Sequence, residues 1–320
     1  MNAQKHTIAL LRRRFALTLA HEKLLCSPAI RARHHSRLTA VARLGNVALA
    51  AGVAWLSYRL LAESPVAGIA TLPLVWFFIG TRFRALGNVM HECAHRTFVP
   101  GARWNLRVGH LLSFIDFSDF TEYTEEHFTH HRHLGDPEAD RDYKMRRALF
   151  ERLGPLGVHH VYHAVGLRHL RWFLRPILFT RNDPRALAVA RATFNVALVA
   201  LAQLVIGWPA FVLYYAVPYL TTYQMMRFFS DAVDHAGVIT EPDEFHRSRN
   251  HIHRWSWVNW LIFPGSDQYH LVHHLFPQIP CGQLARVHQI LLASAEYAAR
   301  EHDLVRLFVP GRPSLRPGAA

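Results

Sequence analysis

The stretch from Ala192 to Met226 carries no formally charged side chain. In a chain otherwise rich in arginine, such a run predicts membrane insertion, because about 20 apolar helical residues span the hydrocarbon core of a bilayer. The run is long enough for two tight crossings or for one very long tilted helix. The turn residues Gly207-Trp208-Pro209 lie at its centre and favour two crossings.

Two further apolar stretches precede it, from Leu44 to Leu61 and from Val66 to Thr81. Arg59, near the end of the first stretch, has a side chain long enough to reach the headgroups. The predicted fold is an all-α membrane protein with four transmembrane helices in two hairpins and a cytoplasmic, histidine-rich cap. We treat it as a single domain that consists of a basic arm (1–43), a first hairpin (44–81), a first part of the cap (82–191), a second hairpin (192–226) and a second part of the cap (227–320).

The distribution of Lys and Arg indicates the orientation. The connections at 62–65 and 207–209 contain neither residue, whereas the arm and both parts of the cap are rich in them, and the formal net charge is +13. Cytoplasmic segments carry the excess of Lys and Arg. We therefore expect a multi-pass protein, in a bacterial cell membrane, with both termini and the cap in the cytoplasm.

Three histidine motifs lie in the predicted cap, and we call them boxes 1, 2 and 3: HECAH at 91–95, HFTHH at 127–131 and HLVHH at 270–274. On a helix, positions i, i+3 and i+4 share a face, so each box presents two or three imidazoles together. Imidazole is a common neutral ligand of transition metals. Eight such ligands exceed the needs of one ion, so two ions are expected at His91, His95, His127, His130, His131, His270, His273 and His274.

A histidine-rich surface is the alternative, since the chain has 24 histidines. Two HxxHH boxes together with an HxxxH box are much harder to obtain by chance than a single motif. Zinc binds imidazole equally well, but structural zinc needs four ligands and hydrolytic zinc three. The surplus favours a pair of iron ions that activate O₂ against the C–H bonds of a lipid chain. Cys93, inside box 1, is interpreted as a small buried residue rather than a ligand.

Metal-bound histidines usually have their second ring nitrogen held by a carboxylate or a carbonyl. The acids near the boxes are Glu92, Asp116, Glu122, Glu126, Asp136, Asp140, Asp234 and Asp267, and the sequence alone does not choose among them. Histidines outside the boxes, His110, His251 and His288 among them, are interpreted as interface or surface residues.

Two other segments, Trp104–Phe120 and Val158–Phe179, combine apolar residues with arginines and are too charged to cross a membrane. Basic residues interleaved with aromatic residues also occur in nucleic-acid-binding proteins. Beside membrane spans, however, they are typical of helices that lie in the lipid interface. We therefore expect no nucleic-acid partner.

With these motifs, the chain resembles the membrane fatty acid desaturase superfamily, from about Val66 to about His288. The resemblance rests on the order HxxxH, HxxHH, HxxHH, on two spans between boxes 2 and 3, and on the sequence YHLVHHLFPQIP at 269–280. It implies that the box histidines bind two irons and that His235 is a ninth ligand. Acyl-CoA members of the family place an asparagine four residues earlier, where it contacts one iron through water, and Asp231 occupies that position here.

The resemblance implies an O₂-dependent desaturase acting on a lipid acyl chain from the bilayer, or a hydroxylase or alkene-forming decarboxylase of the same superfamily. The sequence contains no glycine fingerprint, haem motif or cysteine pair for carrying electrons. A separate donor, a ferredoxin or a cytochrome b5-like protein, is therefore expected. Two other classes remain as alternatives. One is a membrane zinc hydrolase, and the other is a metal transporter, which nearly charge-free spans disfavour.

Overall fold

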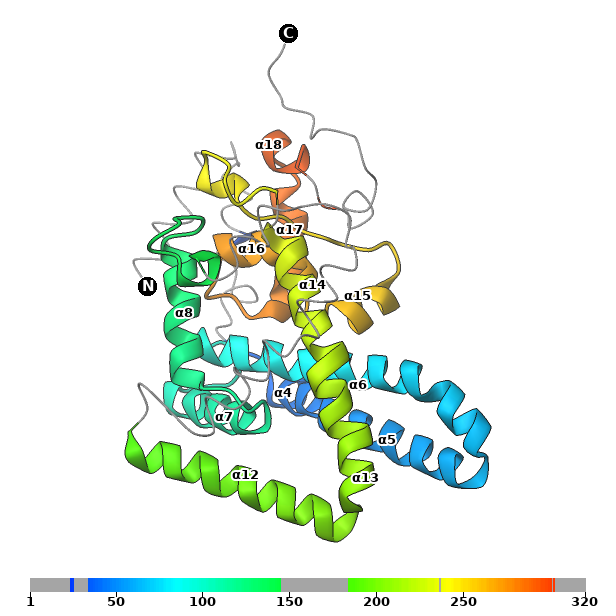
Figure 1. Cartoon of the computed structure of the whole chain (residues 1–320). Coiled ribbons are helices and arrows are strands. Elements are labelled where there is room, and N and C mark those ends of the chain that lie inside the picture. Colours follow the sequence, from blue (N-terminus) through cyan, green and yellow to red (C-terminus); the bar gives the residue numbers. More distant parts are fainter. Residues whose placement is uncertain (1–23, 26–33, 145–183, 236, 301, 303–320) are drawn as a thin grey trace.

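The computed structural model describes residues 24–25, 34–144, 184–235, 237–300 and 302, which form helices joined by loops (Figure 1). The predicted all-α class is confirmed for this part of the chain. The helices, with η for short 3₁₀ or π segments, are α4 (Arg37–Leu44), α5 (Asn46–Glu63), α6 (Pro65–Ala94), α7 (Ala102–Ile115), α8 (Phe120–Arg132), α12 (Arg185–Val205), α13 (Gly207–Phe211), η1 (Val212–Ala216), η2 (Tyr219–Tyr223), α14 (Gln224–His235), η3 (Glu244–His246), α15 (Ser256–Ile262), η4 (Asp267–Tyr269), α16 (His270–Leu275), η5 (Cys281–Gln283), α17 (Leu284–Leu291) and α18 (Ala295–Ala298).

Three helical segments in the described residues are long and apolar enough to cross a membrane: Arg37–Glu63, Pro65–Ala94 and Arg185–Val205. The first two form the first predicted hairpin. Pro65 starts α6, where its missing N–H needs no helical partner. A Cβ on Gly68 would lie 2.5 Å from Cα of Leu61, so α5 and α6 touch beside the turn. Several of their large apolar side chains, among them Trp55, Leu56, Val66 and Leu74, are exposed, as on a lipid-facing surface.

Helix α6 continues without a break from the second predicted span into box 1. Pro73 lies inside the helix and does not end it. Its 30 residues, at about 1.5 Å each, extend for roughly 45 Å. A hydrocarbon core is only about 30 Å thick. The helix is therefore long enough to hold His91 beyond the membrane.

The predicted turn in the second apolar run lies where expected. Helix α12 ends at Val205, and Gly207, with φ of +74°, begins the next helical run. A positive φ is readily adopted only by glycine. The run from Gly207 to His235 is a succession of α13, η1, η2 and α14, in which two π-helical turns interrupt the α-helical hydrogen bonds.

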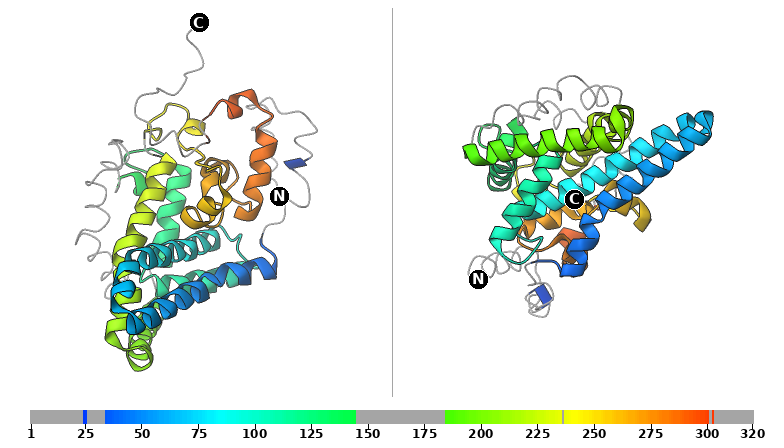
Figure 2. Two further views of the ribbon diagram at one scale, coloured as in Figure 1. Left: turned by 90° about the vertical axis from the view of Figure 1, so that its right-hand side faces the viewer. Right: turned by 90° about the horizontal axis from the view of Figure 1, so that it is seen from below.

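Helix α12 and this second run do not pack side by side along their lengths, unlike the two helices of the first hairpin. They meet at Gly207 and diverge, so that α12 passes beneath α7 (Figures 1 and 2). Buried polar groups explain the direction of α12. Arg191 is fully buried and lies 3.7 Å from the carboxylate of Asp119 at the start of α8, while Phe194 packs on Phe114 of α7.

Tyrosines hold the second run against the end of α7. The hydroxyl of Tyr215 donates to the carbonyl of Ile115 at 2.5 Å, and the hydroxyl of Tyr219 donates to the carbonyl of Asp116 at 2.5 Å. The hydroxyl of Tyr223 donates to Oδ1 of Asp116 at 2.7 Å. These bonds fix the helix that ends at His235 relative to α7.

The C-terminal helices α16 and α17 form a separate apolar cluster above α6 and beside the upper part of α14 (Figure 1). Leu271, Val272 and Leu275 of α16 pack on Leu284 and Val287 of α17. This packing explains why box 3 presents its apolar residues to α17 and leaves its histidines to face the other way. The interfacial segment predicted at 104–120 contains α7, whose Trp104 is exposed. The segment predicted at 158–179 lies outside the described residues.

Candidate metal centre

Four helices bring the histidines of the three boxes and His235 together. His91 lies in the last turn of α6 and His95 caps its end, while α8 carries box 2 and α16 carries box 3. His235 ends α14. Asp119 caps the start of α8 by accepting hydrogen bonds from the backbone N–H groups of Thr121 and Glu122.

The histidine nitrogens gather in two groups, and within each group all ligand atoms lie within 4.8 Å of one another. Group A has five members and group B has four. In group A, Nε2 of His127 lies 2.7 Å from that of His95 and 3.0 Å from that of His131, and His131 lies 3.1 Å from His273. The members of group A are His91, His95, His127, His131 and His273.

In group B, Nε2 of His235 lies 3.1 Å from that of His130 and 2.8 Å from that of His270, and His270 lies 2.9 Å from His274. The two groups adjoin, since the rings of His131 and His274 stack with centroids 4.4 Å apart. Boxes 2 and 3 contribute reciprocally. Each gives its i, i+4 pair to one group and its middle histidine to the other.

These distances fit the ligand shells of transition metals. Two nitrogens in neighbouring positions around one ion at about 2.1 Å lie about 3.0 Å apart. The six Nε2 separations given above, from 2.7 to 3.1 Å, match that value. The structure therefore brings together all nine histidines singled out from the sequence. Asp231 lies one turn before His235 on α14, and its carboxylate is in neither group.

The second ring nitrogens of three group B histidines lie close to acceptors, two of which are buried carboxylates. Nδ1 of His130 lies 3.0 Å from Oδ2 of Asp140, and Nδ1 of His270 lies 3.4 Å from Oδ2 of Asp234. Nδ1 of His235 donates to the carbonyl of Arg247 at 2.9 Å. A carbonyl only accepts, so Nδ1 of His235 carries the proton and, in the neutral ring, Nε2 keeps its lone pair for a metal.

Burial also favours the neutral form of histidines in both groups. Removal from water lowers the pKa of His95 to about 4, and burial followed by neighbouring histidines lowers the pKa of His127 and His131 well below the usual value. The same two causes lower the pKa of His270, His273 and His274. Neutral imidazole is the form that binds metals, so the site is prepared for cations.

The structure selects two of the eight candidate acids, Asp140 and Asp234, as partners of box histidines. Glu92 and Asp116 are buried but bond to other groups, and Asp267 pairs with Arg84 at 2.8 Å. Asp136 is exposed and accepts from backbone N–H groups of its own turn.

The interpretation of the remaining histidines as surface residues is wrong for His35, which is buried and pairs with Glu92, and for two others, His251 and His288. His251 is fully buried, with Nδ1 3.2 Å from Oδ1 of Asp234, and so lies directly behind His270. His288 is buried in α17, with Nδ1 2.8 Å from the Tyr297 hydroxyl. The sequence carried no signal for either, because their burial depends on contacts between distant segments.

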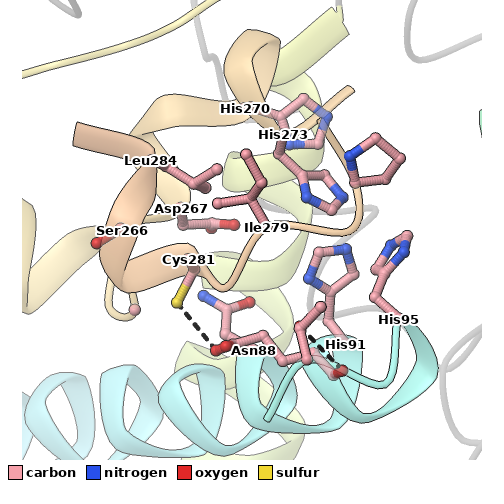
Figure 3. A pocket seen from close by; sticks show the side chains of 14 residues that line it. Asn88, His91, His95, Ser266, Asp267, His270, His273, Ile279, Cys281 and Leu284 are labelled. Atoms are coloured by element: carbon pink, nitrogen blue, oxygen red, sulfur yellow. Dashed lines mark hydrogen bonds between the residues drawn. The ribbon is translucent and has the colours of Figure 1, made fainter. Parts of the chain in front are cut away.

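A pocket between α6 and α16 opens beside the two groups (Figure 3). His91 and His95 line it from α6, and His270 and His273 line it from box 3. Its far end holds a hydrogen-bonded cluster in which the Cys281 thiol donates to Glu92 at 2.9 Å, and Glu92 also pairs with Arg43 and His35. Cys93 is buried and is in neither group, as predicted.

A second, mainly apolar pocket lies between α6 and α7. Its walls include Met90, next to His91, and one acid, Asp116. The other lining residues are Phe83, Leu86, Gly87, Leu112 and Ile115. Such a pocket suits an apolar chain that approaches the histidines from the side of the long helices.

The sequence model described as fatty acid desaturase matches residues 67–305. Dihydrorhizobitoxine desaturase of Bradyrhizobium elkanii is 27% identical over 258 residues, which cover 75% of this chain and 73% of that protein. An omega-3 fatty acid desaturase of the endoplasmic reticulum from Vigna radiata var. radiata is 26% identical over 239 residues, covering 65% of this chain and 61% of that protein.

A chloroplastic sn-2 acyl-lipid omega-3 desaturase (ferredoxin) from Helianthus annuus is 25% identical over 238 residues, which cover 65% of this chain and 52% of that protein. The aligned regions thus span only about half to three fifths of these two plant relatives.

Proposed function

This chain belongs to the fatty acid desaturase family, and on that premise we propose that it inserts a double bond into a lipid acyl chain using O₂. The protein is an integral-membrane oxidoreductase of the non-haem diiron type. The proposal for its chemistry rests on one observation. Nine buried or half-buried imidazoles converge in two adjoining groups, each with the nitrogen spacing of a metal shell.

In this proposal, each group holds one iron ion. Group A offers five nitrogens and group B four, which leaves room at both ions for water or O₂. Asp231 is proposed to reach the second ion through a water molecule. When bound, the iron pair supplies the activation of O₂ that removes hydrogen from an unactivated carbon chain.

The surrounding residues hold the ligands rather than react. Asp140, Asp234 and the carbonyl of Arg247 accept from Nδ1 of His130, His270 and His235, and so orient those rings toward the metal. We propose that the acyl chain enters the pocket between α6 and α7. Its apolar lining reaches Met90, beside the first ligand, and excludes water from the chain.

The proposed membrane arrangement has four spans, one more than the three candidate helices. We propose that the helical run from Gly207 to the region of Met226 is the fourth span, since it is free of charge and begins at the turn after α12. Two hairpins then place both termini and the metal centre on one side, which the Lys and Arg distribution assigns to the cytoplasm of a bacterial cell.

Electrons are proposed to come from a separate carrier, a ferredoxin or a cytochrome b5-like protein. The sequence holds no carrier motif of its own, and one plant relative is named for ferredoxin. The net charge of +13 favours encounter with an acidic carrier. We propose Arg146 and Arg147 of the basic cap as contacts for such a carrier; both lie outside the described residues.

The outcome of oxidation depends on which substrate carbon approaches the metal, so hydroxylation or alkene-forming decarboxylation are the alternatives within the superfamily. One observation also supports a substrate other than a lipid acyl chain. The desaturase from Bradyrhizobium elkanii aligns with 75% of this chain, more than either plant relative. Dihydrorhizobitoxine or a related compound is therefore the second candidate. A membrane zinc hydrolase is disfavoured by the nine ligands.

The test compares cells with and without the gene by profiling both acyl lipids and polar metabolites. A new double bond in an acyl chain supports the first proposal, and a desaturated polar compound supports the second candidate. Purified protein should contain about two irons per chain, and His273→Ala should lower that content while the exposed His133→Ala should not. Stoichiometric zinc, with activity independent of iron, would contradict the proposal.

A further inference from the structure

Helix α15 exposes three tryptophans in a short stretch just before box 3. Trp255, Trp257 and Trp260 are 48%, 59% and 51% exposed. The rings of Trp255 and Trp257 stack with centroids 5.8 Å apart, and the guanidinium of Arg254 lies 4.6 Å from the Trp255 ring. Exposed tryptophans beside a cation are costly in water but are typical of the boundary between lipid headgroups and acyl chains.

Arg82 attaches this helix to the first hairpin. Its side chain is 1% exposed, and its guanidinium donates to the carbonyls of Trp260 at 3.2 Å and Leu261 at 3.4 Å. It also lies 4.0 Å from the Trp260 ring centroid and donates to Oδ1 of Asn46 at 2.9 Å. One arginine thus joins the start of α5, the part of α6 that follows its apolar stretch, and α15.

This attachment sets the level of α15 relative to the apolar surface of the hairpin. Asn46 and Arg82 mark the ends of the two apolar stretches that are nearest the metal centre. Phe78, one turn before Arg82, contacts Trp260 with ring centroids 6.3 Å apart, and Leu74, one turn further along α6, is 72% exposed. Exposed apolar surface therefore continues from α6 onto α15, which lies beside the hairpin in Figure 1 and in the right view of Figure 2.

We propose that α15 lies in the headgroup region of the bilayer leaflet next to the metal centre, with Trp255 and Trp257 inserted among the lipids. Arg254 faces the lipid phosphates, and Arg82 ties the helix to the hairpin. The inference goes beyond the proposed reaction and does not depend on it.

The same part of α6 also holds the segment that leads to box 3. The chain passes from α15 through Pro264 and Asp267 directly to His270. Asn88 of α6 donates to the Pro264 carbonyl at 2.6 Å, and Arg84 pairs with Asp267 at 2.8 Å. Contacts along the same turns of α6 thus hold both the lipid-facing helix and the loop that leads to the metal ligands.

The test uses purified full-length protein in nanodiscs of phosphatidylcholine and phosphatidylglycerol. The tryptophan fluorescence of the double variant Trp255→Phe/Trp257→Phe is subtracted from that of the unchanged protein, which isolates the signal of these two residues. Quenchers are phosphatidylcholine with a doxyl group at carbon 5 or carbon 12 of its chain, and aqueous iodide. An interfacial helix lies about 5–10 Å deep, so the carbon 5 quencher should act more strongly than the carbon 12 quencher or iodide.

Trp76 calibrates the depth. It lies six residues before Arg82 on α6, about 9 Å further along the helix, so the signal lost in Trp76→Phe should be quenched more by the carbon 12 label. The double variant should keep the iron content of the unchanged protein, which excludes misfolding. Strong quenching by iodide alone would place α15 in water and overturn the proposal. Protection from all three quenchers would mean that protein, such as a second copy, covers the helix, and would overturn it as well.

Discussion

Nδ1 of His130 lies 3.0 Å from Oδ2 of Asp140, a carboxylate that is fully buried. The backbone N–H groups of Gly135 and Tyr143 donate to the same carboxylate, each at 3.0 Å. Burial acts to raise the pKa of Asp140, but the hydrogen bond and charge of His130 and the backbone donors outweigh it and lower that pKa. Asp140 is therefore an anion that connects the loop after α8 to a group B histidine.

The first prediction is that Asp140→Ala weakens iron binding about 10- to 100-fold, because His130 loses the partner that orients its ring. Titration of the metal-free protein with Fe²⁺ under anaerobic conditions measures this change. Asp140→Asn, which keeps an acceptor without the charge, should have a smaller effect. Glu138→Gln is the control, since Glu138 is exposed in the same loop and pairs with Lys144. Equal iron affinity in Asp140→Ala and the control would contradict the role given to Asp140.

Helical spacing was sufficient to single out the eight box histidines, because it puts i, i+3 and i+4 on one face, whereas His235 was expected only from the family resemblance. It could not predict how they divide. His127 and His131 join group A with the histidines of box 1, whereas His130 joins group B with His235 of α14. That division depends on tertiary packing.

The carboxylate partners of the histidines could not be predicted from the sequence either. Asp140 is ten residues from His130, and Asp234 is adjacent to His235 but contacts His270 and His251 instead. Spacing along the chain therefore does not identify the partner. For the fold, charge-free runs predicted the long helices and the turn at Gly207. The divergence of α12 was not predictable, because it rests on buried Arg191 and its contact with Asp119 on another helix.

The second prediction concerns Gly80, where α6 meets the helical run that ends at His235. A Cβ at this position would lie 2.4 Å from Oγ1 of Thr222 and 2.8 Å from the backbone nitrogen of Tyr223. Gly80→Ala should therefore push the two helices apart and destabilise the protein by about 1–3 kcal/mol. The displaced run carries His235, so iron content should also fall.

Gly52→Ala is the matched control, because a Cβ on Gly52 of α5 would meet no atom within 4 Å. Alanine also has the higher helix propensity, so this variant should be as stable as the unchanged protein or slightly more so. Thermal unfolding in detergent and iron analysis measure both variants. Equal melting temperatures for Gly80→Ala and Gly52→Ala would show that the close approach at Gly80 does not constrain the fold.

The third prediction is a pH dependence that arises from His288. Burial, followed by the nearby His302, lowers the pKa of His288 to about 4 from its usual 6.5. The hydroxyl of Tyr297 bonds its Nδ1, and the ring of Tyr269 lies 5.4 Å away. Because the unfolded chain binds this proton more readily, the stability that neutral His288 provides is present above pH 6.5 and is lost as the pH falls toward 4.

At pH 5 this loss should be about 1–2 kcal/mol. His288→Gln replaces the imidazole with an amide that is not protonated at pH 5, so the difference in melting temperature between pH 7.5 and pH 5 should be smaller than in the unchanged protein. The other buried histidines contribute equally to both proteins and cancel in the comparison. His133→Gln, at an exposed position, should leave the pH dependence unchanged. The same pH dependence in His288→Gln and His133→Gln would show that His288 does not titrate on unfolding.

The last prediction is the sidedness of the membrane arrangement. Ser64, between α5 and α6, and Trp208, at the start of α13, lie in the two turns that contain no Lys or Arg. Both turns lie at the end of the molecule away from α16 and α17 (Figures 1 and 2). Positively charged segments stay in the cytoplasm, so tags near Ser64 or Trp208 should be accessible to protease in sealed, right-side-out vesicles. Tags at either terminus or between Arg141 and Arg185 should be protected until the vesicles are opened with detergent. If tags in the segments that flank box 2 were accessible on one side of the membrane and tags in those that flank box 3 on the other, the result would be incompatible with a shared metal centre. It would also be incompatible with the proposed fourth span between the two boxes.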